Sequence, residues 1–176
     1  MLTGKQFPLN FVNQPTHPTM KPNIGIAEKN LKAVSELLNT LLADEVILYM
    51  KTRQAHWNYE GDNFSELHKF FESQYSEIDE IMDQVAERVR MLGHYAVGSL
   101  KDLVKIARLD ENKVGYSDQK SSVTSLLNDH ETIIRSLRKD LDEAQNKYKD
   151  AGTADFLTGL MEQHEKMAWM LRAYVQ

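Results

Sequence analysis

Two histidines and a glutamate near the middle of the chain have the residue types and spacing of a metal site. His56 lies five residues before Gly61, and His68 lies seven residues after it. If two antiparallel helices meet at that glycine, the two imidazoles stand at about the same height, within reach of a shared ion. His68 and Glu72 are four positions apart, which places both side chains on one face of a helix.

A second pair, made only of carboxylates, follows on the same predicted helix. Asp83 and Glu87 are also four positions apart. Imidazoles combined with carboxylates suit Fe²⁺, Mn²⁺ or Zn²⁺ and leave coordination positions for water or an oxidant. The 15 residues from His68 to Asp83 span roughly 22 Å of helix, so one chain cannot place both pairs on one metal. A second copy, related by a two-fold axis with these helices antiparallel, would complete two identical sites.

The same residues also have an interpretation without a metal. A histidine or glutamate on a helix is more often hydrogen-bonded or solvated than a ligand. Asp79 and Glu80 extend the Asp83/Glu87 pair into what could be only a solvated face, and spacing alone favours that interpretation. The Glu-x-x-His motif of di-iron sites inside one bundle is absent. The residues three positions before the six histidines are Gln14, Arg53, Ser65, Met91, Leu127 and Met161.

The first two helices are predicted from apolar spacing and from their ends. A helix is predicted from residue 26 to about residue 59, because apolar residues recur there at intervals of three and four. That stripe includes Leu31, Val34, Leu38, Leu41 and Leu48. Asn63 is placed to cap a second helix, with Glu66 in a variant of the capping box. The second helix is expected to end near residue 92, where Gly93 has the position of a C′ glycine.

The rest of the chain completes a helical bundle. A short helix is predicted at 99–109, a polar loop at 110–119, and two long helices at 121–150 and 153–175, separated near Gly152. Four long helices with short connections at the ends and one longer crossover in the middle predict an all-α four-helix bundle.

The composition divides the chain at about residue 25. All four prolines lie in the first 22 residues, so we expect residues 1–25 to form a flexible arm and residues 26–176 to form the bundle. The arm has a formal charge of +2 and the bundle −7, which argues against a general nucleic-acid-binding surface on the bundle.

Three absences narrow the class of protein further. The chain has no cysteine, which excludes a disulfide scaffold, a thiolate zinc site and a cysteine nucleophile. No apolar run approaches the length of a membrane span, and the N-terminus lacks the pattern of a secretory signal. We therefore expect a cytoplasmic protein that does not bind membranes.

Two segments of the chain resemble the signature segments of a known family. They read H-W-N-Y-E-G-D-N-F-S-E-L-H-K-F-F-E from His56 and M-D-Q-V-A-E-R-V-R-M-L-G-H-Y-A from Met82. Both are similar to the Dps family, mini-ferritins of the ferritin-like superfamily named as DNA-binding proteins from starved cells. The similarity extends from about Asn23 to the A-W-M-L-R-A-Y segment near the C-terminus.

The resemblance implies a hollow dodecamer with a ferroxidase site between two-fold-related subunits. His56 and His68 of one subunit and Asp83 and Glu87 of its neighbour would then bind iron, two ions per site, and carry its oxidation. Glu72 would be a further ligand or an outer carboxylate. The family's chemistry is oxidation of Fe²⁺, preferentially by hydrogen peroxide, with ferric mineral stored in the cavity. Such chemistry protects the cell against oxidative damage.

Two alternatives remain open at this stage. The first is a DNA-compacting, nucleoid-associated protein with little ferroxidase role. The arm offers only Lys5 and Lys21 to phosphates, although twelve arms would add avidity, so we rank weak DNA binding second. The other alternative is a structural bundle without metal, in which the resemblance has lost its functional meaning.

Overall fold

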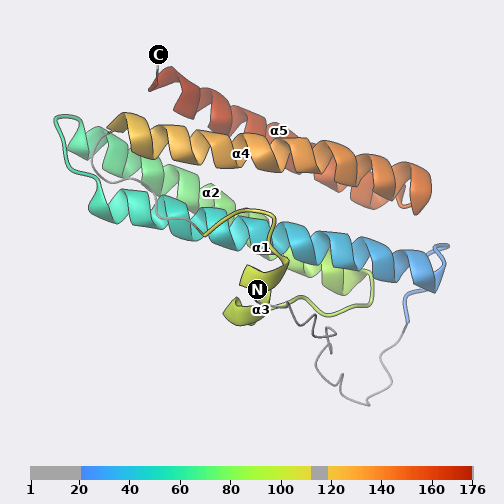
Figure 1. Ribbon diagram of the computed structural model, residues 1–176. Helices are drawn as coiled ribbons and strands as arrows, with labels where there is room; N and C mark the ends of the chain where they lie inside the picture. The colour runs from blue at the N-terminus through green and yellow to red at the C-terminus, as the bar shows by residue number, and fades with distance from the viewer. Residues whose placement is uncertain (1–20, 112–118, 176) are drawn as a thin grey trace, which may run out of the picture.

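The computed structural model describes residues 21–111 and 119–175, and these ranges hold helices and no strand. The helices are α1 (Glu28–Asn58), α2 (Phe64–Met91), α3 (Leu100–Ile106), α4 (Gln119–Asp142) and α5 (Ala151–Ala173), with a π-helical turn, η1 (Glu143–Lys147). One hairpin consists of α1 and α2, the other consists of α4 and α5, and the two pack together lengthwise (Figure 1). The predicted four-helix bundle with a short helix in its central crossover is confirmed. Most of the predicted arm and polar loop lies outside the described residues.

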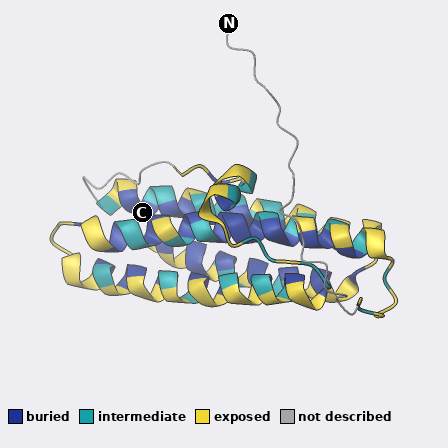
Figure 2. Ribbon diagram, turned by 90° about the horizontal axis from the view of Figure 1, so that it is seen from below, coloured by how far each residue is buried: buried dark blue, intermediate teal, exposed yellow. Residues whose placement is uncertain are grey.

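The core of the bundle is built from the predicted apolar stripes. On α1, every residue of the stripe given above exposes 1% of its surface or less. The facing stripe on α2 includes Leu67, Phe71, Ile78, Ile81 and Val85. Buried residues lie on the helix faces turned toward the middle of the bundle (Figure 2). Each such side chain contributes about 1.5–3 kcal/mol on burial, so the stripes drive the pairing of the helices.

Helix α2 ends at Met91, and Gly93 follows it as the C′ glycine that the sequence predicted. Gly93 has a φ of +85°, and its amide donates to the Arg90 carbonyl at 3.0 Å. The amide of His94 donates to the Val89 carbonyl at 3.3 Å, which completes a Schellman motif. A Cβ atom on Gly93 would lie 2.6 Å from Cδ of Pro22. The segment before α1 is therefore packed against the end of α2, and only glycine fits there.

The predicted cap of α2 is wrong in its side-chain detail. Asn63 does precede the helix, but its side chain makes no capping hydrogen bond. Its Nδ2 instead donates to Oε1 of Gln119 at 3.2 Å, at the first residue of α4. A tertiary contact between the two hairpins has thus replaced the local capping box.

The junction between α4 and α5 also differs from the prediction. The α-helical part of the third long helix ends at Asp142, the π-helical turn η1 continues it to Lys147, and Lys149 then reverses the chain with a φ of 60°. Gly152 does not separate the helices, because it lies in the first turn of α5. Asp150 caps that helix by accepting bonds from the Thr153 amide at 2.9 Å and the Thr153 hydroxyl at 2.6 Å. A carboxylate that satisfies free amides makes a sharper helix start than the glycine could.

The central crossover is fixed by one buried carboxylate on α1. Asp44 accepts hydrogen bonds from the amides of Arg108 and Leu109 and from Nε of Arg108 at 2.7 Å. The same guanidinium donates to Asp140 of α4 at 2.7 Å. Asp44 thereby holds the chain leaving α3 between the two hairpins.

Within the described ranges, no helix has the length and apolar character needed to cross a membrane.

Candidate metal centre

The α1–α2 hairpin brings His56 and His68 into direct contact. His56 lies in the last turns of α1, and His68 lies in the second turn of α2. Their rings stack with centroids 3.7 Å apart and an interplanar angle of 21°. His56 is buried and His68 is half-buried. The predicted juxtaposition of the two imidazoles across the hairpin is what the structure has.

The two histidines hold each other in one tautomer. Nδ1 of His56 lies 2.8 Å from the backbone oxygen of His68, and Nδ1 of His68 lies 3.0 Å from the backbone oxygen of His56. A carbonyl oxygen can only accept, so each Nδ1 must carry the hydrogen. In a neutral ring, Nε2 then has a free lone pair. A histidine that ligates a metal usually has its other nitrogen held in this way.

Aromatic and cationic side chains fix the positions of the two rings. The rings of Tyr75 and His56 meet nearly at a right angle with a centroid distance of 5.2 Å, and the Phe64 ring lies 5.1 Å from that of His68. Arg53 lies over the Tyr75 ring at 4.4 Å and over the Trp57 ring at 5.1 Å. Such contacts limit the rotation of His56 and so pre-organise its Nε2.

The neighbours Tyr75 and Arg53 are absent from the sequence prediction, although spacing could have pointed to them. Tyr75 lies seven residues after His68, two turns along the same face of α2, and Arg53 lies three residues before His56.

The three predicted carboxylates all lie exposed on α2. Glu72, Asp83 and Glu87 make no hydrogen bond or ion pair with another described residue. The part of the chain that the structure describes holds no cluster of three or more histidine and acidic side chains able to bind a metal. A single chain therefore presents a pair of imidazoles and, farther along α2, a separate row of carboxylates. The assignment of all five residues as iron ligands stays a prediction.

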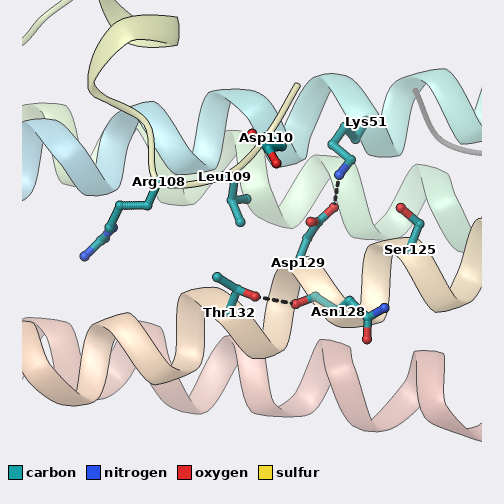
Figure 3. Close-up of a pocket in the computed structure, with 8 residues that line it drawn as sticks. All are labelled: Lys51, Arg108, Leu109, Asp110, Ser125, Asn128, Asp129 and Thr132. Atoms are coloured by element: carbon teal, nitrogen blue, oxygen red, sulfur yellow. Dashed lines mark hydrogen bonds and ion pairs between the residues drawn. The ribbon is translucent and has the colours of Figure 1, made fainter. Parts of the chain in front are cut away.

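An open pocket of about 410 Å³ lies elsewhere, between α1, α4 and the crossover (Figure 3). It is lined by Lys51, Arg108, Leu109, Asp110, Ser125, Asn128, Asp129 and Thr132. Lys51 of α1 forms an ion pair with Asp129 of α4 in its wall. Burial raises the pKa of Asp129, the bond from Lys51 opposes that rise, and the charge of Asp110 adds to it. With no histidine in its lining, this pocket is separate from the His56/His68 pair.

Comparisons with known proteins agree with this architecture. Residues 35–176 match the ferritin-like domain family. The chain is 42% identical to an uncharacterized low temperature-induced protein of Nostoc over 154 residues, which cover 88% of this chain and 86% of the relative. It is 35% identical to DNA protection during starvation protein 2 of Bacillus anthracis over 144 residues, 82% of this chain and 97% of the relative.

Solved structures give the same result. The Dps protein of Vibrio cholerae, described as a member of a broad superfamily of ferritin-like diiron-carboxylate proteins, superposes with a TM-score of 0.82 at 29% identity, covering 89% of this chain and 97% of its own. A Dps protein of Bacillus brevis superposes with a TM-score of 0.79 at 34% identity, covering 84% and 98%. The chain therefore belongs to the Dps family of ferritin-like proteins.

Proposed function

We propose that this protein is a ferroxidase that oxidises Fe²⁺ with hydrogen peroxide and stores the ferric product inside a closed shell of identical subunits. Membership in the Dps family of ferritin-like proteins supports a role in iron storage or DNA protection. The observation that carries the finer proposal is the reciprocal bonding of His56 and His68, which leaves both Nε2 lone pairs free for a metal.

In this proposal, the substrate iron binds between two subunits. His56 and His68 of one subunit face Asp83 and Glu87 of its neighbour, with Glu72 one turn after His68 on α2. The support is that Asp83 and Glu87 are exposed, have no ion-pair partner among the described residues, and lie too far along α2 to meet the histidines of their own chain. A two-fold axis is the simplest operation that completes the site, and it produces two sites at once.

The proposed reaction uses two Fe²⁺ ions and one peroxide. Each Fe²⁺ gives one electron, the O–O bond breaks, and two protons are taken up, so that two Fe³⁺ ions and two waters form. Hard, anionic carboxylates favour Fe³⁺ over Fe²⁺ and so favour the oxidation. Paired transfer avoids the one-electron step that releases hydroxyl radical, which is how such a protein would protect against oxidative damage.

Complementation between subunits tests the proposal. A His56→Ala/His68→Ala variant and an Asp83→Asn/Glu87→Gln variant are each expected to lose peroxide-driven Fe²⁺ oxidation while keeping their assembly. If the two are co-assembled at equal amounts, half of the dimers are mixed, and each mixed dimer has one intact site. Roughly a quarter of the wild-type activity should then return. Mixtures that stay inactive would contradict a site shared between subunits.

The relatives' names favour DNA protection as a second function. The formal charge of +2 on residues 1–25 supports only weak contact with phosphates, against −7 on the rest of the chain. A gel shift across a salt series measures it. We expect DNA to be released at physiological salt, and its retention there would reverse the ranking of the two functions.

A further inference from the structure

A second histidine pair lies in the core of the bundle, far from the first. Nδ1 of His130 on α4 is 3.0 Å from Nδ1 of His164 on α5. Nε2 of His164 is 3.0 Å from Oε1 of Glu45 on α1. All three residues expose 1% of their surface or less. Glu45 precedes His56 by 11 residues, or roughly 16 Å along α1, so this cluster is separate from the proposed iron site.

The cluster joins the two hairpins through a buried charge. The Glu45–His164 contact has the length of an ion pair but not the alignment of a hydrogen bond, and neither oxygen of Glu45 has a hydrogen-bond partner among the described residues. A buried carboxylate is costly unless an opposite charge lies beside it. Since Nε2 of His164 is the group in contact with it, this imidazole must supply the compensating proton.

The other charged groups near the cluster are already paired. Lys51 of α1 is bound to Asp129, the residue before His130 on α4. Asp44, the residue before Glu45, is bound to Arg108. Among the described residues of α2, none with a titratable side chain is buried. Glu45 and the two imidazoles therefore balance their charge among themselves.

Counting hydrogens shows how many protons the pair can hold. Two Nδ1 atoms at 3.0 Å accommodate one hydrogen between them, because two N–H groups would collide and two lone pairs would repel. With one hydrogen on each Nε2, the two rings carry at most three. Three ring hydrogens give a charge of +1, which Glu45 neutralises. A fourth hydrogen cannot enter without breaking the contact between His130 and His164.

We propose that Glu45, His164 and His130 form an acid-sensitive latch that holds the α1–α2 hairpin to the α4–α5 hairpin and opens when the histidine pair takes up a fourth ring hydrogen. This latch does not depend on iron or on the proposed oxidation. It gives the bundle a means of loosening in acid at the contact between its two halves.

The direction of the pH effect follows from His130. Burial, together with the neighbouring charge of His164, lowers the pKa of His130 well below its ordinary value. The unfolded chain accepts this proton below about pH 6.5, whereas the folded bundle excludes it. The His130 site therefore contributes its full stability above about pH 6.5, and that contribution falls as the pH decreases from there toward the lowered pKa.

Urea unfolding of the full chain between pH 8 and pH 5, followed by circular dichroism, tests the latch. For the wild type, the unfolding equilibrium constant should rise up to about tenfold per pH unit below pH 6.5 on account of this proton. In His130→Asn, the amide oxygen can replace Nδ1 as acceptor but takes up no proton. Its unfolding equilibrium constant should therefore lack this rise of up to about tenfold per pH unit that the wild type shows. Equal slopes in the two proteins would overturn the proposal.

Two further proteins keep the test decisive. His94→Asn removes a half-buried histidine that contacts exposed Glu28, and it should retain the wild-type slope. If His130→Asn does not fold, the Glu45→Leu/His130→Leu/His164→Leu variant, which replaces the whole cluster, should show the flattened slope instead. Metal analysis of the His56→Ala/His68→Ala protein tests the alternative that a metal ion occupies the Glu45, His130 and His164 cluster. One bound metal per chain that disappears on Glu45→Gln would mean that a cation, not a proton, occupies the cluster.

Discussion

The two histidine pairs of this bundle use one type of side chain in opposite ways. In the His56–His68 pair, each Nδ1 hydrogen is held by a backbone carbonyl, and both Nε2 atoms keep a free lone pair. In the His130–His164 pair, the Nδ1 atoms bond to each other, and Nε2 of His164 faces Glu45. The group that holds Nδ1 thus decides whether a histidine is free to bind a ligand or is committed to the fold.

The carboxylates show the same contrast. Glu45 is fully buried, so its charge has to be balanced within the subunit. Asp83 and Glu87 are exposed and make no ion pair with a described residue, so water screens them in the isolated chain. Removal of the first should therefore cost folding free energy, whereas removal of the other two should cost function alone.

The largest effect is expected from His164→Ala, which strips the buried carboxylate of its partner. An uncompensated buried charge costs about 3–5 kcal/mol. Urea unfolding at pH 7.5 should show that loss in the free energy of unfolding. His94→Ala is the matched control, since His94 contacts the exposed Glu28, and surface pairs contribute about 1 kcal/mol or less.

Replacing the whole cluster distinguishes the cost of leaving the Glu45 charge without a partner from the cost of losing the packing contacts of His164. In Glu45→Leu/His130→Leu/His164→Leu, no charge remains buried, and apolar side chains of similar size fill the space. We expect this variant to be markedly more stable at pH 7.5 than His164→Ala. If the two were equally unstable, the cluster would act through its shape and not through its charge.

A smaller effect is expected at the other pair. His56→Ala/His68→Ala should weaken Fe²⁺ binding at least about 100-fold, or about 2.7 kcal/mol, because both imidazole ligands are lost. Anaerobic calorimetric titration of the assembled protein with Fe²⁺ measures it, and His94→Ala should bind as the wild type does. Unchanged binding by the double variant would show that these residues do not belong to the proposed iron site.

The sequence predicted one histidine pair and missed the other, for a physical reason. His56 and His68 flank a tight connection between two helices, so local spacing alone brings them together. His130 and His164 are 34 residues apart, and only the packing of α4 against α5 joins them. The available signal was position: each lies in the apolar stripe of its helix, near residues such as Ile133 and Met161.

The helix ends divide in the same way. Gly93 was predictable because a left-handed residue at a helix end is a local requirement that glycine meets. The role of Asn63 was not predictable, because its side chain donates a hydrogen bond to Gln119, which lies 56 residues away. Asp150, the actual cap of α5, also accepts a bond from Arg88 of α2 at 3.3 Å, so its position depends on the other hairpin.

A moderate effect is expected from loosening the first pair without removing it. Tyr75→Leu removes the aromatic ring that packs against His56, a contact of about 0.5–1.5 kcal/mol. Fe²⁺ affinity should fall by about tenfold or less, because His56 would sample other orientations. Tyr75→Phe keeps the ring and should keep the affinity. A loss in Tyr75→Phe equal to that in Tyr75→Leu would assign the effect to the hydroxyl group instead.

The smallest effect on folding is expected at Asp83 and Glu87, where the loss of Fe²⁺ oxidation should be complete. Asp83→Asn/Glu87→Gln should change the free energy of unfolding by no more than about 0.5 kcal/mol, because both side chains are exposed and unpaired within the described chain. The same variant should abolish peroxide-driven Fe²⁺ oxidation. Asp79→Asn/Glu80→Gln makes the same change of charge one turn earlier on α2, also at exposed positions, and should leave the oxidation intact. Equal losses in the two variants would mean that α2 attracts Fe²⁺ through its total charge, whereas a loss confined to the first identifies these two carboxylates as the partner subunit's half of the site.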